Sequence, residues 1–112
     1  MQMIEAIIQP DRLDAVKTAL ARLGILGITA MESVGFGRQC NQAVNYRGMR
    51  MTVESCPKIL LKVVVKDYET APTIHAIVHA GRTGQVGDGK VFVHPVNEAV
   101  RIRTGELNDA AI

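Results

Sequence analysis

The chain has no tryptophan and only two phenylalanines and two tyrosines among 112 residues, so its core must be aliphatic. So few aromatic side chains provide little means of stacking on nucleobases. A formal net charge of +2 is also too small to indicate binding to nucleic acid or to an anionic membrane surface. We therefore expect a core of Val, Ile, Leu, Met and Ala and no nucleic-acid partner.

Cysteines and long apolar runs are scarce as well. Cys40 and Cys56 are too few for a disulfide scaffold, and ordinary thiols are favoured over a regulatory disulfide across the loop that they flank. No apolar run approaches bilayer length, and the first five residues lack the charged and apolar regions of a signal peptide. We expect a single cytoplasmic domain over residues 1–112, without direct insertion into a membrane.

The chain does have a glycine-rich stretch at residues 83–93, Thr-Gly-Gln-Val-Gly-Asp-Gly-Lys-Val-Phe-Val. Closely spaced glycines allow successive backbone N–H groups to face one anion, and Lys90 adds a compact positive charge. Gly84, Gly89 and Lys90 reproduce the spacing of a phosphate-binding loop. Val91 stands where that loop needs a hydroxyl and opens a strand, which argues against phosphate binding at a helix N-terminus. A glycine-rich hairpin without a ligand is the alternative.

The apolar pattern predicts four strands, at residues 1–9, 25–35, 58–66 and 91–94, and two helices, from Asp11 to Gly24 and from Asp67 or Thr70 to Gly81. This order fits an α+β, ferredoxin-like split βαβ fold, in which both helices cover one face of a four-stranded antiparallel sheet. The inward positions are Leu13, Val16, Leu20 and Leu23 on the first helix and Ala71, Ile74, Ile77 and Val78 on the second. Leu60, Val64 and Phe92 are expected on the bare face, which another copy of the chain would cover.

Two segments near the ends of these elements suggest a binding role. Residues 37–55 follow no period, and so long an unpatterned segment is typical of a functional or a disordered loop. A short final strand at residues 96–103 would place Arg101 and Arg103 on one side. With Lys90, this arginine pair suits a polyphosphate, and a solvated basic edge is the alternative.

No catalytic constellation is evident. Asp88 lies between two glycines, where turn formation is favoured over a role in chemistry. His75 and His79 have the i, i+4 spacing of a helical metal-binding pair. Because Ala76 replaces the glutamate of that motif, two surface histidines are the default interpretation.

These motifs together resemble the PII family of signal-transduction proteins, and the similarity runs essentially end to end. Residues 83–93 are similar to the family's C-terminal signature, 101–106 and 109–112 to its closing segment, and 35–39 and 46–48 to its long T-loop. The resemblance implies a homotrimer that is not an enzyme and that binds ATP or ADP in clefts between subunits. It would control a target in nitrogen or carbon metabolism, such as an ammonium transporter, through a flexible T-loop at about residues 37–55.

The resemblance also implies the residues of each site. The nucleotide would contact Thr29, Gly37, Arg38, Gln39, Val64, Gly87, Asp88, Gly89, Lys90, Arg101, Ile102 and Arg103. 2-Oxoglutarate would contact Gln39, Lys58 and Gly87, and Gln39 would also help to hold Mg²⁺. Because the keto acid chelates the metal carried by ATP, the two ligands would bind cooperatively and reshape the T-loop.

The T-loop would bind the partner through Tyr46, Arg47, Met49, Arg50 and Met51. Met51 stands where uridylylated relatives carry tyrosine, so this position cannot be uridylylated. Arg47, which in relatives enters the pore of ammonium transporters, is kept, whereas Arg50 replaces an acidic residue. Lys62 also replaces a usually acidic residue, and Cys40 and Asn41 depart from the usual residues beside the keto acid.

Two other functions are compatible with the residues. A ferredoxin-like nucleotide phosphohydrolase would use Arg38 and the glycine-rich stretch and would turn nucleotide over. A metal-handling trimer would use His75 and His79.

Overall fold

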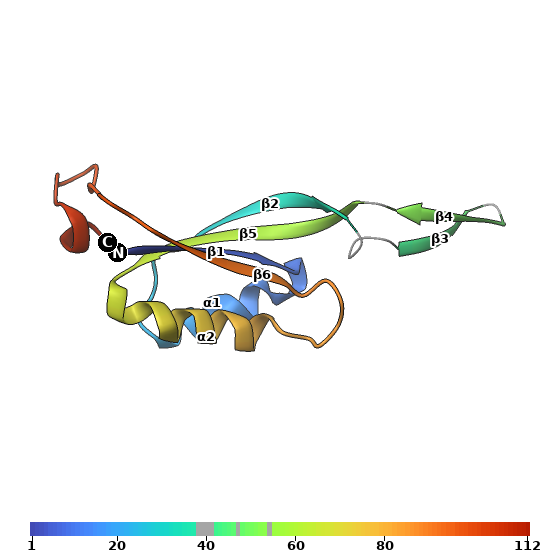
Figure 1. Ribbon diagram of the computed structural model, residues 1–112, viewed down its shortest axis with the longest axis horizontal. Coiled ribbons are helices and arrows are strands. Elements are labelled where there is room, and N and C mark those ends of the chain that lie inside the picture. The colour runs from blue at the N-terminus through green and yellow to red at the C-terminus, as the bar shows by residue number, and fades with distance from the viewer. Residues whose placement is uncertain (38–41, 47, 54) are drawn as a thin grey trace.

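The computed structural model describes residues 1–37, 42–46, 48–53 and 55–112. Its strands are β1 (Gln2–Ile8), β2 (Thr29–Phe36), β3 (Gln42–Tyr46), β4 (Met49–Val53), β5 (Ser55–Val65) and β6 (Gly89–Pro95), and its α-helices are α1 (Leu13–Arg22) and α2 (Thr70–Gly81). Short 3-10 helices lie at Pro10–Arg12, Asp67–Glu69 and Asn108–Ala111. Four strands form an antiparallel sheet in the order β2-β5-β1-β6, and both helices cover one face (Figure 1). The predicted α+β, ferredoxin-like arrangement is confirmed.

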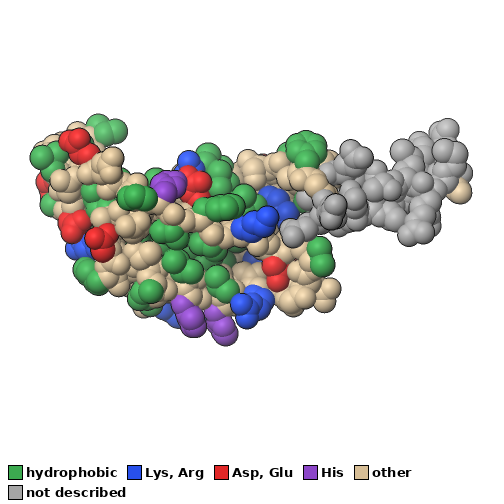
Figure 2. Space-filling view, viewed as in Figure 1, with side chains coloured by type: hydrophobic (Ala, Val, Ile, Leu, Met, Phe, Trp, Pro, Cys, Tyr) green, Lys and Arg blue, Asp and Glu red, His purple; other side chains and the backbone are tan. Residues whose placement is uncertain are grey.

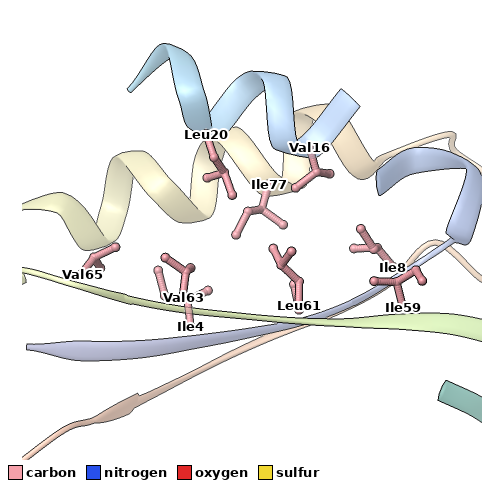
Figure 3. Close-up of a cluster of buried hydrophobic side chains, with 10 residues drawn as sticks. Ile4, Ile8, Val16, Leu20, Ile59, Leu61, Val63, Val65 and Ile77 are labelled. Atoms are coloured by element: carbon pink, nitrogen blue, oxygen red, sulfur yellow. The ribbon is translucent and has the colours of Figure 1, made fainter. Parts of the chain in front are cut away.

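The core lies between the sheet and the helices and is aliphatic, as the composition predicts (Figure 3). Alternate residues of β1 and β5 point toward the helices, and the strands pair in the register Ile4↔Val63, Ala6↔Leu61 and Ile8↔Ile59. Val16 and Leu20 of α1 and Ile77 of α2 close the core from the other side. Burial of each such branched side chain contributes about 1.5–3 kcal/mol, so this layer is the main source of stability.

The inward faces of the helices differ from the prediction at three positions. Leu23 is 45% exposed because α1 has already ended, and Gly24 follows with φ +79. On α2, Ala71 is exposed and Thr73 is fully buried in its place. The hydroxyl of Thr73 donates to the backbone oxygen of Glu69 at 2.7 Å, so burial leaves no unpaired polar atom there.

The expectation that residues 37–55 lack regular structure is wrong for two segments. β3 and β4 pair antiparallel, from Gln42↔Val53 to Tyr46↔Met49, and Gly48 turns between them with φ +77. This two-stranded ribbon is separate from the main sheet and lies beyond the ends of β2 and β5 (Figure 1). Strands of five residues give only a short stretch of alternation, which is the signal on which strand prediction depends.

The final strand predicted at residues 96–103 does not form. In this fully described part of the chain, the only strand-like pairing of residues 96–103 is one isolated antiparallel bridge, between Val100 and Leu107. The chain reverses direction between these two residues. The N–H of Gly105 donates to the Arg101 oxygen at 2.8 Å, and the N–H of Arg101 donates to the Glu106 oxygen at 2.9 Å. Gly105 has φ +74, which this reversal requires. Arg101 and Arg103 therefore do not share one side of a strand.

Candidate functional site

Asp88 organises the glycine-rich loop between α2 and β6. Its carboxylate accepts hydrogen bonds from the backbone N–H groups of Thr83 and Gly84, each at 2.9 Å, and from the hydroxyl of Thr83. These hydrogen bonds, led by the one from the Thr83 side chain, lower the pKa of Asp88 below its ordinary value. The loop is thus closed on itself, as the turn interpretation of Asp88 predicts.

Gly87 lies at the buried end of this loop, and its carbonyl oxygen accepts two side-chain hydrogen bonds. The ammonium of Lys58 donates at 2.5 Å and the amide of Gln9 at 2.8 Å. Lys58 is only 6% exposed, although a buried ammonium is unfavourable unless polar groups surround it. Two of the three residues expected at 2-oxoglutarate, Lys58 and Gly87, are therefore in direct contact. The third, Gln39, lies outside the described residues.

Gly89 starts β6 against the backbone of β1. Its φ is +104, and a Cβ placed on it would lie 1.7 Å from the carbonyl oxygen of Ile7. No side chain fits in that space, so the close approach of the two strands requires glycine. Lys90 follows directly and is exposed beside the loop.

A second group of candidate residues lines a pocket of about 700 Å³ at the other end of the sheet. Thr29, Val64 and Arg101, all expected at the nucleotide, meet there. Lys62, Lys66 and Glu69 also line it, so the cavity combines apolar walls with an excess of positive charge. Two of its cations are paired, Lys62 with Glu5 and Arg101 with Glu106. Such a mixture suits a ligand with a flat apolar part and anionic groups.

These two groups are far apart within one chain. Gly89 pairs with Ile8 and Pro95 with Gln2, so the seven residues of β6 separate the glycine-rich loop from the pocket. Seven residues of strand span about 20 Å. The loop that follows α2 and the C-terminal segment accordingly lie at opposite ends of the main sheet (Figure 1).

The remaining predicted residues lie beyond these two groups. Ile102 and Arg103 are exposed in the turn after the pocket, and Gly37 is exposed after β2 with φ +135. Tyr46 ends β3, and Met49, Arg50 and Met51 belong to β4. Arg38, Gln39, Cys40, Asn41 and Arg47 lie outside the described residues.

Comparison with known proteins identifies the family. The family described as "Nitrogen regulatory protein P-II" matches residues 1–106. The chain belongs to the PII family. Proteins named "Nitrogen regulatory protein P-II" from Azospirillum brasilense, Bradyrhizobium diazoefficiens and Microchaete diplosiphon are 51%, 49% and 48% identical to it over 112 residues, the full length of each chain.

PII proteins are signal-transduction regulators rather than enzymes, so the hydrolase interpretation is not supported. The family generally binds nucleotides and 2-oxoglutarate. The chain is therefore a PII-type regulator of nitrogen metabolism. In the part of the chain that the structure describes, no helix is both long and apolar enough to cross a membrane.

The sheet face away from the helices has an ion pair at its centre and apolar residues around it, and by register Ser33, Lys58, Lys90 and His94 lie on the same face. Lys62 and Glu5 lie 3.3 Å apart at its centre. By register, the apolar side chains on this face are Met3, Ile7, Met31, Leu60, Val64 and Phe92. Phe92 is 50% and Met31 is 41% exposed, and a contiguous apolar patch of this kind commonly marks an interaction surface.

Cys56 contradicts the preference for ordinary thiols. It pairs with Gly35 in the ladder between β2 and β5 and is disulfide-bonded.

Sequence reasoning also missed some residues of the site. Gln9 reaches Gly87 across 78 positions, and Lys66 lines the pocket together with Ala111 and Ile112 of the C-terminal segment. None carries a local signal, because each acquires its place only through tertiary packing.

Proposed function

We propose that this PII protein is a homotrimeric, cytoplasmic sensor of adenine nucleotides. ATP or ADP binds in each cleft between two neighbouring chains, and with ATP the cleft also takes Mg²⁺ and 2-oxoglutarate. The observation that carries the proposal is the division of the candidate residues between opposite ends of one sheet. Since about 20 Å of strand lies between them, one nucleotide reaches both groups most simply when each comes from a different chain.

One chain supplies the phosphate side of the cleft. Gly87 and Gly89, with φ +103 and +104, give the backbone there a conformation that lets N–H groups face an anion without interference from side chains. The exposed ammonium of Lys90 balances phosphate charge at the start of β6. Arg38 and Gln39, with Gly37 before them, are proposed to complete this side, where Gln39 would help to hold the metal.

The neighbouring chain supplies the base side. Val64 and the hydroxyl of Thr29 lie in the pocket of about 700 Å³, where an adenine would find both an apolar wall and a polar group. Arg101 lines the same pocket, and Arg103 stands exposed beyond it. These two arginines, with Ile102 between them, would reach back to the phosphates of the shared nucleotide.

Lys58 is the proposed partner of the carboxylate of 2-oxoglutarate. An ammonium has three N–H donors, and the contact with Gly87 uses one of them. Among the described residues, the group that this ammonium contacts is a neutral carbonyl, and a carboxylate would stabilise a buried cation better. When bound, Mg²⁺ would link the keto acid to ATP by accepting oxygen ligands from both.

The T-loop is the proposed output of the sensor. Gly37 leads from β2 toward it, and Lys58 on β5 lies shortly after its return, so both strands that carry it pass the phosphate side. Ligand-dependent changes there would alter how Tyr46, Arg47, Met49, Arg50 and Met51 meet a target. A nitrogen- or carbon-metabolism protein, including an ammonium transporter that accepts Arg47, is the proposed class of target.

Calorimetric titration with ATP and with ADP tests this function. We expect one nucleotide per chain, with an affinity at least tenfold lower in Arg103→Ala and unchanged in Arg22→Ala, an exposed arginine on α1. 2-Oxoglutarate is expected to bind only after Mg²⁺ and ATP are added. The proposal is wrong if the wild type binds neither nucleotide, or if Arg103→Ala binds as the wild type does.

A further inference from the structure

The exposed side of α2 carries two histidines and no formal charge. Its exposed residues are Ala71, Pro72, His75 and His79, and the whole helix contains no Asp, Glu, Lys or Arg. A helix that only needs to remain solvated normally presents charged side chains on its outer face. Here, the two imidazoles are the polar groups of that face.

His75 and His79 are arranged as a pair. Their rings lie parallel within 3°, with centroids 6.1 Å apart, because residues four apart stand above one another on a helix. Two imidazoles that share one metal ion through bonds of about 2.0–2.1 Å have centroids roughly 4.5–6.5 Å apart. The observed separation lies within this range, but parallel rings do not point at a common ion, so ligation requires both side chains to turn out of the stacked arrangement. Both imidazoles are exposed, which leaves them room for that rotation.

We propose that His75 and His79 form a surface site for one late-transition-series divalent ion, of the Ni²⁺, Cu²⁺ or Zn²⁺ class. Imidazole nitrogen suits these ions, whereas Mg²⁺ prefers oxygen ligands, so the site is chemically distinct from the metal proposed beside ATP. Among the described residues no group of three or more His, Cys, Asp and Glu gathers to hold a metal. Water therefore completes the coordination, and the ion exchanges readily.

The pair is also accessible. Figure 2 shows two histidines side by side at the surface over the helix layer. α2 covers the face of the sheet opposite to the bare apolar face, so a trimer assembled through that bare face leaves the pair in solvent. The site does not depend on nucleotide and is independent of the function proposed above.

Calorimetric titration of tag-free, metal-depleted protein with NiCl₂, without nucleotide, tests the site. We expect one Ni²⁺ per chain at pH 7.5 and at least tenfold weaker binding in His75→Gln and in His79→Gln. His94→Gln removes the remaining imidazole of the chain, which is exposed on β6, and is expected to bind Ni²⁺ as the wild type does. Binding should also weaken at least tenfold at pH 5.5, because ligation requires imidazoles that are neutral and their ordinary pKa is about 6.5.

The competing outcomes are distinct. Wild-type affinity in either His75→Gln or His79→Gln, an equal loss in His94→Gln, or no Ni²⁺ binding by the wild type would each overturn the site. Replacement of Ni²⁺ by Cu²⁺ should tighten binding and replacement by Mn²⁺ should weaken it. ATP titration of the same variants separates the two proposals, because the histidine variants are expected to bind ATP normally.

Discussion

The ammonium of Lys58 donates a 2.5 Å hydrogen bond to the carbonyl oxygen of Gly87, across 29 positions of sequence and in a buried setting. This contact fastens the glycine-rich loop to β5 near the point where β5 leaves the T-loop. Through this contact, a change at the glycine-rich loop is proposed to reach the start of β5, where the T-loop is expected to end. In this account the same lysine also recognises the keto acid.

Lys58→Met tests that role because it keeps the length of the side chain and removes its charge. The Gly87 oxygen retains the bond from Gln9, and an apolar replacement for a buried charge is often tolerated, so we expect the free energy of unfolding to change by at most about 1 kcal/mol. 2-Oxoglutarate binding with Mg²⁺ and ATP should fall at least tenfold, since a charged hydrogen bond contributes about 1.5–3 kcal/mol. Titration calorimetry and urea unfolding measure the two effects.

Gln9→Met is the matched control for Lys58. It removes the uncharged donor from the same carbonyl oxygen and should leave the affinity for 2-oxoglutarate within about threefold. Equal losses in both variants would mean that Lys58 only supports the loop.

Gly89→Ala should be strongly destabilising, because its Cβ would lie 1.7 Å from the Ile7 oxygen in addition to the strain of φ +104. We expect a loss of roughly 3 kcal/mol or more. Gly84→Ala also falls at positive φ, +86, but its Cβ would meet nothing within 4 Å, so a loss of about 1–2 kcal/mol is expected. Urea unfolding of both variants measures the difference, and equal losses would contradict the close approach of β6 to β1.

The acid stability of the protein should depend on Asp88. Hydrogen bonds from Thr83 lower the pKa of Asp88 from its ordinary value of 3.8, so its carboxylate stabilises the folded state above that pH. This contribution is lost as the pH falls from 3.8 through the lowered pKa. The wild type should therefore exceed Asp88→Asn in stability at pH 6, by an amount that shrinks as the pH falls below 3.8.

Urea midpoints measured from pH 6 to pH 3 provide the test for Asp88. Glu98→Gln, at an exposed position after β6, is the control and should stay close to the wild type throughout. A difference between wild type and Asp88→Asn that stays constant over this range would contradict the assignment.

Phe92→Asp should dissociate the proposed trimer. Phe92 is 50% exposed on the bare face of the sheet, and a carboxylate placed there could not be buried against another chain without a large desolvation penalty. Light scattering after size-exclusion chromatography should give three chains for the wild type and one for the variant. Thr18→Asp, on the exposed side of α1, should remain trimeric. A monomeric wild type would refute the trimer itself.

Regular features of the fold could be read from the sequence. In β1 and β5, every second residue is apolar and faces the helices, which is the pattern of a half-buried strand. Gly24, with its positive φ just after α1, stops the helix as predicted. The β3–β4 ribbon was missed because each of its strands has only five residues and pairs apart from the main sheet, so the alternation of Met49, Met51 and Val53 is too short to stand out. The final strand was predicted from its apolar alternation, but the turn at Gly105 prevails over that local preference.

The site was predictable where a motif carries its own geometry. The role of Asp88 in the turn follows from its place between two glycines, and its partners are only four and five residues away. By contrast, Lys58 and Gln9 meet at Gly87 only because β5, β1 and the glycine-rich loop converge. Contacts between segments so far apart in the sequence cannot be predicted from a local sequence pattern.

Subunit mixing tests the shared cleft most directly. Lys90→Ala damages only the phosphate side of a chain and Arg103→Ala only the base side, so every cleft of either pure trimer carries one defect. In a mixed trimer, one cleft joins the intact phosphate side of an Arg103→Ala chain to the intact base side of a Lys90→Ala chain. We predict that co-expressed mixed trimers bind one ATP per trimer with wild-type affinity, whereas binding no tighter than in the pure variants would contradict a nucleotide held between two chains.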